Sequence, residues 1–352
     1  MSAPQKSPLR QAAETSVLRP AEEWSLRAQA WLLLGKHALY GLSAARILVG
    51  VALLGLLISN FGDRYVLWGP ASFWAEPHRE TSEFGALLGI FSTQSPALFT
   101  VFYLALMAVT VAVILGWRTR PMILLLVLGM AGLVERADTL GDQGDNIARI
   151  GLTLMLLMNV TAHWSLDARR RRRAQSRGQL SVWQKLWHGL PVLPRWITDP
   201  LHNVGLIALA CQIFILYTAS ALFKVQGDLW QDGTALHYPL SLHEYGVFPW
   251  LNSVLTADPY MVTVLTYGSI FVQMFFPVGL LHPVTRRLAL LGIIFFHGGI
   301  AVLMGLPWFS LAMLAFDAIF VSSLTWRRLQ LLVRRSRAHR RRRRRSSAAA
   351  AE

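Results

Sequence analysis

Long, uninterrupted runs of apolar residues recur along this chain and are separated by shorter polar segments. Strands with one wet face alternate apolar and polar residues, whereas these runs are continuous, and several approach the roughly 20 residues that a helix needs to cross a bilayer. A helix also satisfies its backbone polar groups within one segment, as the hydrocarbon core requires. The pattern therefore predicts an all-α polytopic integral membrane protein with about eight transmembrane helices. The predicted spans are residues 39–60, 96–116, 121–135, 147–163, 204–223, 261–281, 288–304 and 307–325.

The predicted spans divide the chain into three regions. These are a cytoplasmic N-terminal segment (1–38), a transmembrane domain (39–325) and a basic cytoplasmic tail that is predicted to be disordered (326–352). Within the domain, 164–203 is expected to be a basic, interfacial cytoplasmic loop and 224–260 an outer loop. The spans at 121–135 and 147–163 are short, which leaves open whether they cross the membrane completely.

Basic residues set the predicted orientation. Of the 34 Lys and Arg residues, 28 lie in the loops and termini on the side of the N-terminus. Cytoplasmic segments carry such an excess, so we expect both termini in the cytoplasm and a multi-pass protein of the cell (inner, cytoplasmic) membrane. The net charge of +15 comes largely from runs such as 169–173 and 334–345, which flank predicted spans. We therefore expect these runs to contact the anionic head groups of the lipid bilayer, and we expect no nucleic-acid partner.

Composition excludes several classes of protein. Apolar residues make up 54% of the chain, more than a soluble domain can bury, so much apolar surface must face lipid. Cys211 is the one cysteine, which excludes an intrachain disulfide and a Cys-x-x-Cys redox pair. His237 and His243 lack the spacing of a usual ligand motif, so we expect no metal.

Two charged residues fall inside predicted spans, where each costs about 2.5–3.5 kcal/mol on insertion scales. Arg46 lies in the first span and Asp317 in the last, at similar depths from the cytoplasmic side. One hypothesis is that they form an intramembrane pair that holds these two spans together. The alternative is that Arg46 extends to the inner head groups.

Polar residues also gather near the predicted outer ends of the spans. Asp145 has the position of an N-cap, Asn146 follows it, and Arg149 lies at i+4 from Asp145, where the two can pair on one helix face. Trp230 and Asp232 belong to the outer loop. These five residues form a candidate substrate-binding cluster. The alternative is a structural cluster, because a capped helix start explains Asp145, although it explains Arg149 less well.

Lys224 raises the main chemical question. Tyr217, Ser220 and Lys224 are separated by three and four residues, so they share one face of the fifth span. Burial in a protein pocket disfavours a charged lysine and would let its amine accept a proton. His297 lies about 10 Å below the outer surface in the seventh span. A lone histidine in a helix bundle is more often a hydrogen-bonded core residue than a catalyst, and both interpretations stay open.

Several stretches, taken in order, resemble one family. They are AARILVGVALL (44–54), GDNIAR (144–149), HWSLDA (163–168), YTASALFKVQGDLWQDGTALHY (217–238), FFPVGLL (275–281) and FFHGGIAVLMGLPWFSLAM (295–313). Residues 40–325 thus resemble the horizontally transferred transmembrane (HTTM) domain family, which is distantly related to the membrane domain of vitamin K-dependent γ-carboxylase. The segment K-x-x-G-x-x-W-x-x-G-T-A, which begins at Lys224, is the most specific part of the resemblance.

The resemblance implies a chemistry. In the carboxylase, a lysine at the position of Lys224 deprotonates reduced vitamin K from the lumenal side, and a histidine matches His297. For this chain the resemblance implies that Lys224 is a catalytic base assisted by His297 and Tyr217. It also implies a reduced quinone as cofactor, a menaquinol or a relative of vitamin K hydroquinone, and a carboxylase-like or epoxidase-like activity (a lyase or oxidoreductase).

Three departures limit that implication. In the predicted span at 261–281, Gln273 stands where many relatives carry an acid. Ile147 and Ala148 stand near the place where the carboxylase carries a further histidine. The resemblance also does not reach the large lumenal portion of the carboxylase that holds its substrate protein. Glutamate carboxylation is therefore not carried over to this chain.

A second interpretation is non-catalytic. The chain would then be a membrane partner in the maturation or export of a small secreted protein or peptide, or a transporter. A cavity with apolar walls that reaches Lys224 and His297 from the lipid would favour the enzyme. A continuous polar path from Arg46 and Asp317 to the outer cluster would favour transport.

Overall fold

The computed structural model describes residues 22–72, 89–175, 181–242 and 246–349, and the regular structure of this part is helical throughout. The longer helices are α2 (Leu39–Ser59), α5 (Pro96–Leu115), α6 (Thr119–Val134), α7 (Gln143–Met155), α10 (Arg195–Val225), α14 (Pro259–Gly279), α15 (Pro283–Leu303), α16 (Pro307–Asp317) and α17 (Ser323–Ala349). The shorter elements are α3 (Arg64–Leu67), η2 (Gly89–Phe91), η3 (Glu135–Leu140), α8 (Leu166–Gln175), α9 (Val182–His188), α11 (Asp228–Gln231), α12 (His237–Ser241), α13 (Pro249–Ala257) and η5 (Ala318–Phe320). Residues 22–33 are helical as well.

The membrane class is supported, but eight complete crossings are not. Within the described residues, five helices are long and apolar enough to cross a membrane: α2, α5, α10, α14 and α15. The count rises to six if residues 307–320 and 323–336, which meet at a bend of 111°, form one broken span. Helices α6 and α7 have 16 and 13 residues. At 1.5 Å per residue they extend about 24 and 20 Å, less than the roughly 30 Å of a hydrocarbon core.

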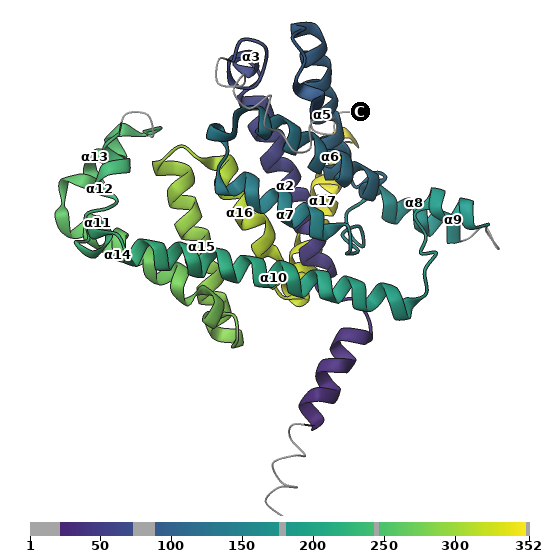
Figure 1. Cartoon of the computed structure of the whole chain (residues 1–352). Helices are drawn as coiled ribbons and strands as arrows, with labels where there is room; N and C mark the ends of the chain where they lie inside the picture. Colours follow the sequence, from purple (N-terminus) through teal and green to yellow (C-terminus); the bar gives the residue numbers. More distant parts are fainter. Residues whose placement is uncertain (1–21, 73–88, 176–180, 243–245, 350–352) are drawn as a thin grey trace, which may run out of the picture.

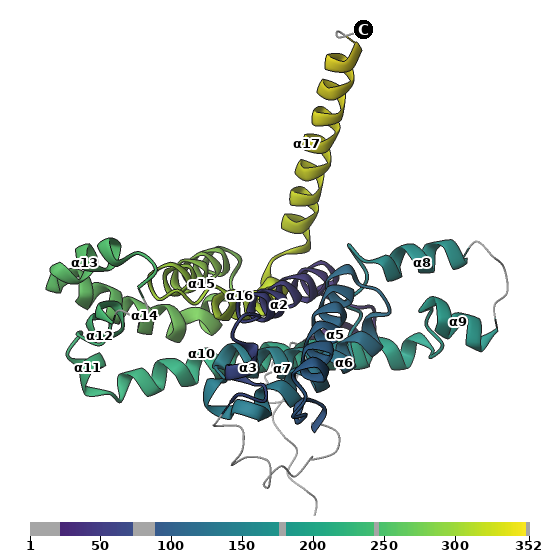
Figure 2. The same ribbon diagram turned by 90° about the horizontal axis from the view of Figure 1, so that it is seen from above.

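The helices form two groups that meet at α16 (Figures 1 and 2). Helices α2, α5, α6 and α7 pack with one another in the first group, and α10, α14 and α15 in the second. Helix α16 contacts α2, α7 and α15. Helix α10 extends from the end that carries α8 and α9 to the end that carries α11–α13, and α17 projects away from the other helices. Residues on α16 therefore lie where both groups can reach them.

Close contact of α2 with α16 and with η5, which follows α16, depends on small residues. Gly41 lies directly against the backbone of Ala318, so a side chain there would collide with it. Gly55 faces the indole of Trp308, whose Nε1 donates to Ser59 Oγ at 2.7 Å. Small residues let helix backbones approach and gain van der Waals contact, which drives helix association in lipid. This packing fixes the depth of Asp317 relative to α2.

Arg46 and Asp317 do not form the predicted ion pair. Asp317 instead accepts a hydrogen bond from Tyr217. The Arg46 guanidinium is fully buried and donates to four backbone carbonyl oxygens, at 2.6 Å to Ile114, 3.0 Å to Trp164, 3.2 Å to Val160, and also to Val113. Helix α5 ends beside Arg46, and the last carbonyls of a helix lack partners and carry partial negative charge, which attracts a cation with several donors. Arg46 therefore caps α5, and it does not extend to head groups either.

Candidate functional site

Three helices bring Tyr217, His297 and Asp317 together in the interior. The Tyr217 hydroxyl, on α10, donates to Oδ2 of Asp317 on α16 at 2.8 Å and lies 3.1 Å from Nε2 of His297 on α15. All three side chains are buried. Phe276 of α14 packs edge-on against the Tyr217 ring, with the ring centroids 4.8 Å apart. Two of the predicted catalytic candidates are therefore neighbours, and the carboxylate of Asp317 joins them.

The Tyr217 hydroxyl lies between two groups that can each hold a proton. The hydroxyl carries one proton, so while it donates to the Asp317 carboxylate it can accept only from an Nε2–H of His297. If Asp317 is protonated, the same hydroxyl can accept from the carboxyl and donate to Nε2 instead. At the outer ends of this line, Nδ1 of His297 and Oδ1 of Asp317 are buried and lack a hydrogen-bond partner among the described residues. The arrangement can hold a proton and shift it between the carboxyl and the imidazole.

Lys224, at the end of α10, turns toward protein groups. Its Nζ donates to Oε1 of Gln273 on α14 at 2.6 Å, and the Ser220 hydroxyl donates to the same oxygen at 3.3 Å. Nζ also lies 4.9 Å from the ring centroid of Trp230 and 5.0 Å from that of Phe296. The side chain is half-buried, and within the described residues no carboxylate forms an ion pair with it. The amine is thus held by one neutral oxygen and two aromatic rings.

Phe296 connects this amine with the buried triad. The Lys224 Nζ lies 5.0 Å from the centroid of its ring, and the same ring packs edge-on against the His297 ring with the centroids 5.0 Å apart. Tyr217 and Lys224 are two helical turns apart on α10, so the triad lies deeper along the same face. The polar groups therefore form two layers, an outer Lys224–Gln273 pair and an inner Tyr217–His297–Asp317 triad.

Of the outer-loop candidates, Trp230 belongs to this site and Asp232 has no described bond to it. Trp230 lies on α11, directly after α10, and presents its ring to Lys224. No hydrogen bond or ion pair among the described side chains joins Asp232 to Lys224. In the described ranges no three His, Cys, Asp or Glu side chains come together as metal ligands would.

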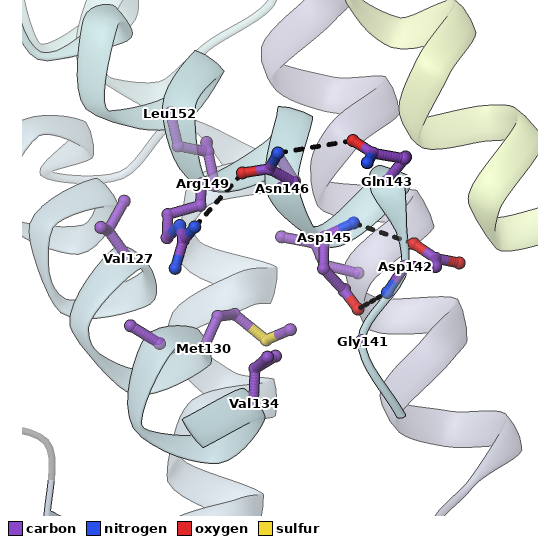
Figure 3. A pocket seen from close by; sticks show the side chains of 13 residues that line it. Val127, Met130, Val134, Gly141, Asp142, Gln143, Asp145, Asn146, Arg149 and Leu152 are labelled. Carbon is purple, nitrogen blue, oxygen red and sulfur yellow. Dashed lines mark hydrogen bonds between the residues drawn. The ribbon is translucent and has the colours of Figure 1, made fainter. Parts of the chain in front are cut away.

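The other three candidates of the outer cluster line a separate cavity of about 420 Å³ (Figure 3). Asp145, Asn146 and Arg149 of α7 form its polar side. Apolar residues of α2 and α6, such as Leu53 and Met130, form the opposite wall. Lys224, His297, Trp230 and Asp232 do not line this cavity. The predicted cluster of five residues is therefore divided between two places.

The helix start at this cavity differs from the expected one. Asp142 is the N-cap of α7, and Asp145 is the third helical residue. The two form a capping box, in which Asp145 N donates to Asp142 Oδ1 at 3.0 Å and Asp142 N donates to Asp145 Oδ2 at 3.3 Å (Figure 3). Arg149 donates to Asn146 Oδ1 at 3.2 Å rather than pairing with Asp145. A carboxylate at N3 fits the reciprocal bonds of a capping box, which explains the shift by one turn.

Burial makes the Asp145 carboxyl a weaker acid than usual. Loss of hydration raises the pKa of its carboxyl to about 6, and the nearby Asp142 carboxylate acts in the same direction. The backbone hydrogen bond from Asp142 and the charge of Arg149 act in the opposite direction. The Asp145 carboxyl on the polar side of this cavity therefore changes charge near pH 6.

Some features of the site could not be identified from the sequence. Gln273 was visible as a polar residue within an apolar helix, but nothing in the sequence indicates that its oxygen accepts from Lys224. Phe296 resembles any lipid-facing aromatic residue. The partner of Asp317 depends on how α10 and α16 pack, and residue spacing along the chain carries no such information.

Comparison with known proteins places the inner and outer layers in one domain. Residues 195–326 match the family model of the HTTM domain, which confirms the predicted family over a shorter segment than 40–325. This segment includes α10 through α16, and so all five residues of the two layers, whereas the cavity beside α7 lies outside it.

One relative adds limited information. The chain is 25% identical over 220 residues to the uncharacterized protein YitO of Bacillus subtilis (strain 168). The similar region covers 58% of this chain and 62% of YitO, so the chain spans less than two thirds of the relative. No solved structure matches the chain.

Proposed function

With an HTTM domain over residues 195–326 as the premise, we propose that this chain is a membrane enzyme in which the Lys224 amine accepts a proton from a lipid-soluble quinol. The observation that carries the proposal is the position of that amine. It is bonded to the neutral Gln273 at 2.6 Å and lies between two aromatic rings. A lysine that only marks a membrane boundary extends its amine to the head groups, and this one is directed into the protein.

The side chains around Lys224 suit an aromatic, lipid-soluble ligand. A reduced quinone such as a menaquinol, when bound, would supply a weakly acidic phenolic O–H and reducing electrons. Trp230 and Phe296 offer aromatic surface for such a ring, and the Gln273 amide and Ser220 hydroxyl offer polar contacts beside it. Phe223 and Phe295, on α10 and α15, are 75% and 77% exposed and provide apolar surface toward the lipid.

The protein groups have distinct roles in this proposal. Gln273 Oε1 accepts one N–H of Lys224 and so fixes the direction of the amine. The faces of Trp230 and Phe296 stabilise the ammonium that proton uptake produces, by about 0.5–2 kcal/mol for each favourable cation–π contact. Behind them, Tyr217 can receive or return a proton because its hydroxyl lies between His297 and Asp317.

The basic-residue distribution supports an orientation for this activity. We propose that both termini are cytoplasmic and that Lys224 faces the outer side of a bacterial cell membrane, since 28 of 34 Lys and Arg residues lie on the other side. We infer the kind of activity, carboxylase-like or epoxidase-like, from the family relation. A small exported protein or peptide is one candidate for the final substrate.

Transport is less well supported. A transport path would need polar groups that continue from Arg46 through Asp317 to the outer cluster. Arg46 is instead bonded to four carbonyl oxygens, and Asp317 to Tyr217. The outer cluster is itself divided between two places. No observation singles out a non-catalytic role in maturation of an exported peptide, and the experiment below distinguishes that role from catalysis.

The test is complementation of a deletion strain of the native host. Wild-type chain, Lys224→Met, Lys224→Arg and a control variant, Lys185→Met in α9, are expressed at equal membrane levels. The quinone pool and the exported peptides are then profiled by mass spectrometry. We expect wild type and Lys185→Met to restore the same profile, and both Lys224 variants to fail, since neither methionine nor an arginine that stays charged accepts a proton.

Two results would contradict the proposal. If both Lys224 variants restore the wild-type profile, proton uptake by this amine is not needed. If the deletion changes exported peptides and every Lys224 variant corrects them, the chain acts as a non-catalytic maturation partner.

A further inference from the structure

A cavity of about 540 Å³ lies at the end of the molecule that carries α8 and α9, far along α10 from Lys224. Four segments border it: Lys36 before α2, residues 118–121 at the start of α6, residues 156–161 after α7, and the stretch from α8 to the start of α10. The distribution of Lys and Arg favours one side of the membrane for the three basic segments among them, which are Lys36, residues 118–121 and the stretch from α8 to α10. The packing thus gathers the basic loops around one hollow.

Positive charge dominates the lining of this cavity. Five cationic side chains border it, and Asp167 is the one acidic residue among its lining residues. The five are Lys36, Arg118, Arg120, Arg170 and Arg171.

Asp167 is already fully engaged. Its oxygens accept from the backbone N–H groups of Arg118 and Thr119 at 3.0 and 2.9 Å and from the Thr119 hydroxyl at 2.9 Å. One oxygen also pairs with Arg170 at 3.0 Å. The carboxylate therefore serves as an N-terminal cap of α6 supplied from α8, and it is one negative charge among five cations.

Three of the cations have no carboxylate partner in the described part of the chain. Arg171 donates to the hydroxyl and the carbonyl of Thr161, at 2.8 and 2.7 Å. The Arg118 guanidinium lies 3.7 Å from the ring centroid of Trp187, and Arg120 is exposed. In addition, Nε of Arg170 is buried without a hydrogen-bond partner among the described residues. The N–H groups of Arg118 and Arg120, and those of Arg171 that do not bond Thr161, are available to an anion with several oxygen atoms.

The cations also repel one another. Burial lowers the pKa of Arg171, and the nearby charges of Arg170, Arg120 and Arg172 lower it further, while Asp167 raises it. A bound anion would relieve this repulsion. A phosphate suits the arrangement, because guanidinium groups bind phosphate oxygens with paired N–H donors.

Apolar residues complete the wall on the side of α10. Val192, Leu193 and Leu201 line the cavity and are exposed. The neighbouring Trp183, Trp187 and Trp196 are 81%, 61% and 75% exposed, as tryptophans of the membrane interface are. Inorganic phosphate gains no contact from an apolar wall, whereas the acyl chains of a phospholipid can pack against it.

We propose that this cavity binds the phosphate head group of an anionic phospholipid, held by Arg118, Arg120 and Arg171, with its acyl chains against Val192, Leu193 and Leu201. The site uses only part of the arginine run 169–173, so it differs from general attraction of basic loops to an anionic surface. It is also independent of the chemistry proposed for Lys224.

The test is native mass spectrometry of the full chain, purified in a neutral detergent and titrated with short-chain phosphatidylglycerol, short-chain phosphatidylcholine or inorganic phosphate. We expect one phosphatidylglycerol to be retained in preference to phosphatidylcholine. Arg120→Gln should weaken this binding about fivefold, the effect of about 1 kcal/mol per charge. Arg169→Gln removes a charge from the same region but outside the cavity, so it serves as the matched control and should leave binding unchanged.

Each other outcome overturns the proposal. Equal retention of both lipids would show that the phosphate charge is not recognised. Equal losses in Arg120→Gln and Arg169→Gln would show diffuse attraction instead of a site. If inorganic phosphate is retained and displaces phosphatidylglycerol as efficiently as the lipid itself, the cavity is a free-phosphate site. Arg120 is exposed and Arg118→Gln offers a second variant, so the result does not depend on a substitution that disturbs folding.

Discussion

The phenolic oxygen of Tyr217 lies 2.8 Å from Oδ2 of Asp317, a residue one hundred positions later in the chain. The bond crosses from α10 to α16 inside the protein, where a carboxylate without partners would be costly. The bond between Tyr217 and Asp317 therefore stabilises the packing of α10 against α16. It also fixes the position of the hydroxyl that contacts His297.

Tyr217→Phe should destabilise the protein by about 1–2 kcal/mol, because the ring still packs but the buried Asp317 loses its donor. Thermal unfolding in detergent measures the change. In a double-mutant cycle with Asp317→Ala, which leaves no acceptor for the hydroxyl, the two losses should not add, since each substitution removes the same bond. The exposed Tyr238→Phe is the matched control and should change little. Additive losses would mean that the hydroxyl and the carboxyl do not act on each other.

Arg46→Gln should destabilise the protein by more than about 2 kcal/mol, since four backbone carbonyl oxygens lose a charged donor. The exchanged double variant Arg46→Asp with Asp317→Arg tests whether the two residues form a pair. Each residue has its own partners, so the exchange should be at least as unstable as either single variant. If the double variant recovers stability, the result would support the hypothesis of an ion pair between Arg46 and Asp317.

Gln273→Glu should slow chemical labelling of Lys224 by an amine-reactive ester. A carboxylate in place of the amide, 2.6 Å from Nζ, forms an ion pair and holds the amine as an unreactive ammonium. An ion pair worth about 1.4 kcal/mol corresponds to about a tenfold lower rate. Peptide mass spectrometry measures the rate, with Lys185 in the same sample as the internal reference. Gln273→Met, which adds no charge, should not slow the labelling, and equal rates in all three proteins would argue against the contact.

The Asp145 carboxyl should make stability depend on pH. Its pKa of about 6 in the folded protein lies above the ordinary 3.8, so the folded state binds more protons between these values and loses stability as pH rises toward 6. Asp145→Asn keeps an oxygen for the capping box and removes this loss. The melting temperature of the variant relative to wild type should therefore be higher at pH 7 than at pH 5. Asp63 is an exposed carboxyl outside the cavity, so Asp63→Asn should show no such difference. If the melting temperature of Asp145→Asn differs from that of wild type by the same amount at pH 5 and pH 7, the raised pKa of Asp145 is refuted.

The sequence by itself determined the class of protein and part of the site. The apolar runs are too long and too numerous for a soluble interior, so a helical membrane protein followed directly from the cost of leaving backbone groups unpaired in lipid. The spacing of Tyr217, Ser220 and Lys224 indicated one face of one helix, because the α-helical period is a local property. Residue order around Lys224 was enough to indicate the HTTM family, which the match at 195–326 confirms.

Only the tertiary structure decided which helices meet and at what depth. The sequence left two partners open for Arg46, an ion pair with Asp317 or contact with the inner head groups. Arg46 instead binds carbonyl oxygens at the end of α5, because that helix ends beside it. Residues 307–325 were predicted to be one span, whereas residues 307–320 and 323–336 meet at a bend of 111°. Helical periodicity fixes which side chains share a face, but the partner of that face depends on packing between helices far apart in the sequence. That packing is set by small contacts such as Gly41 against Ala318, which no local pattern reveals.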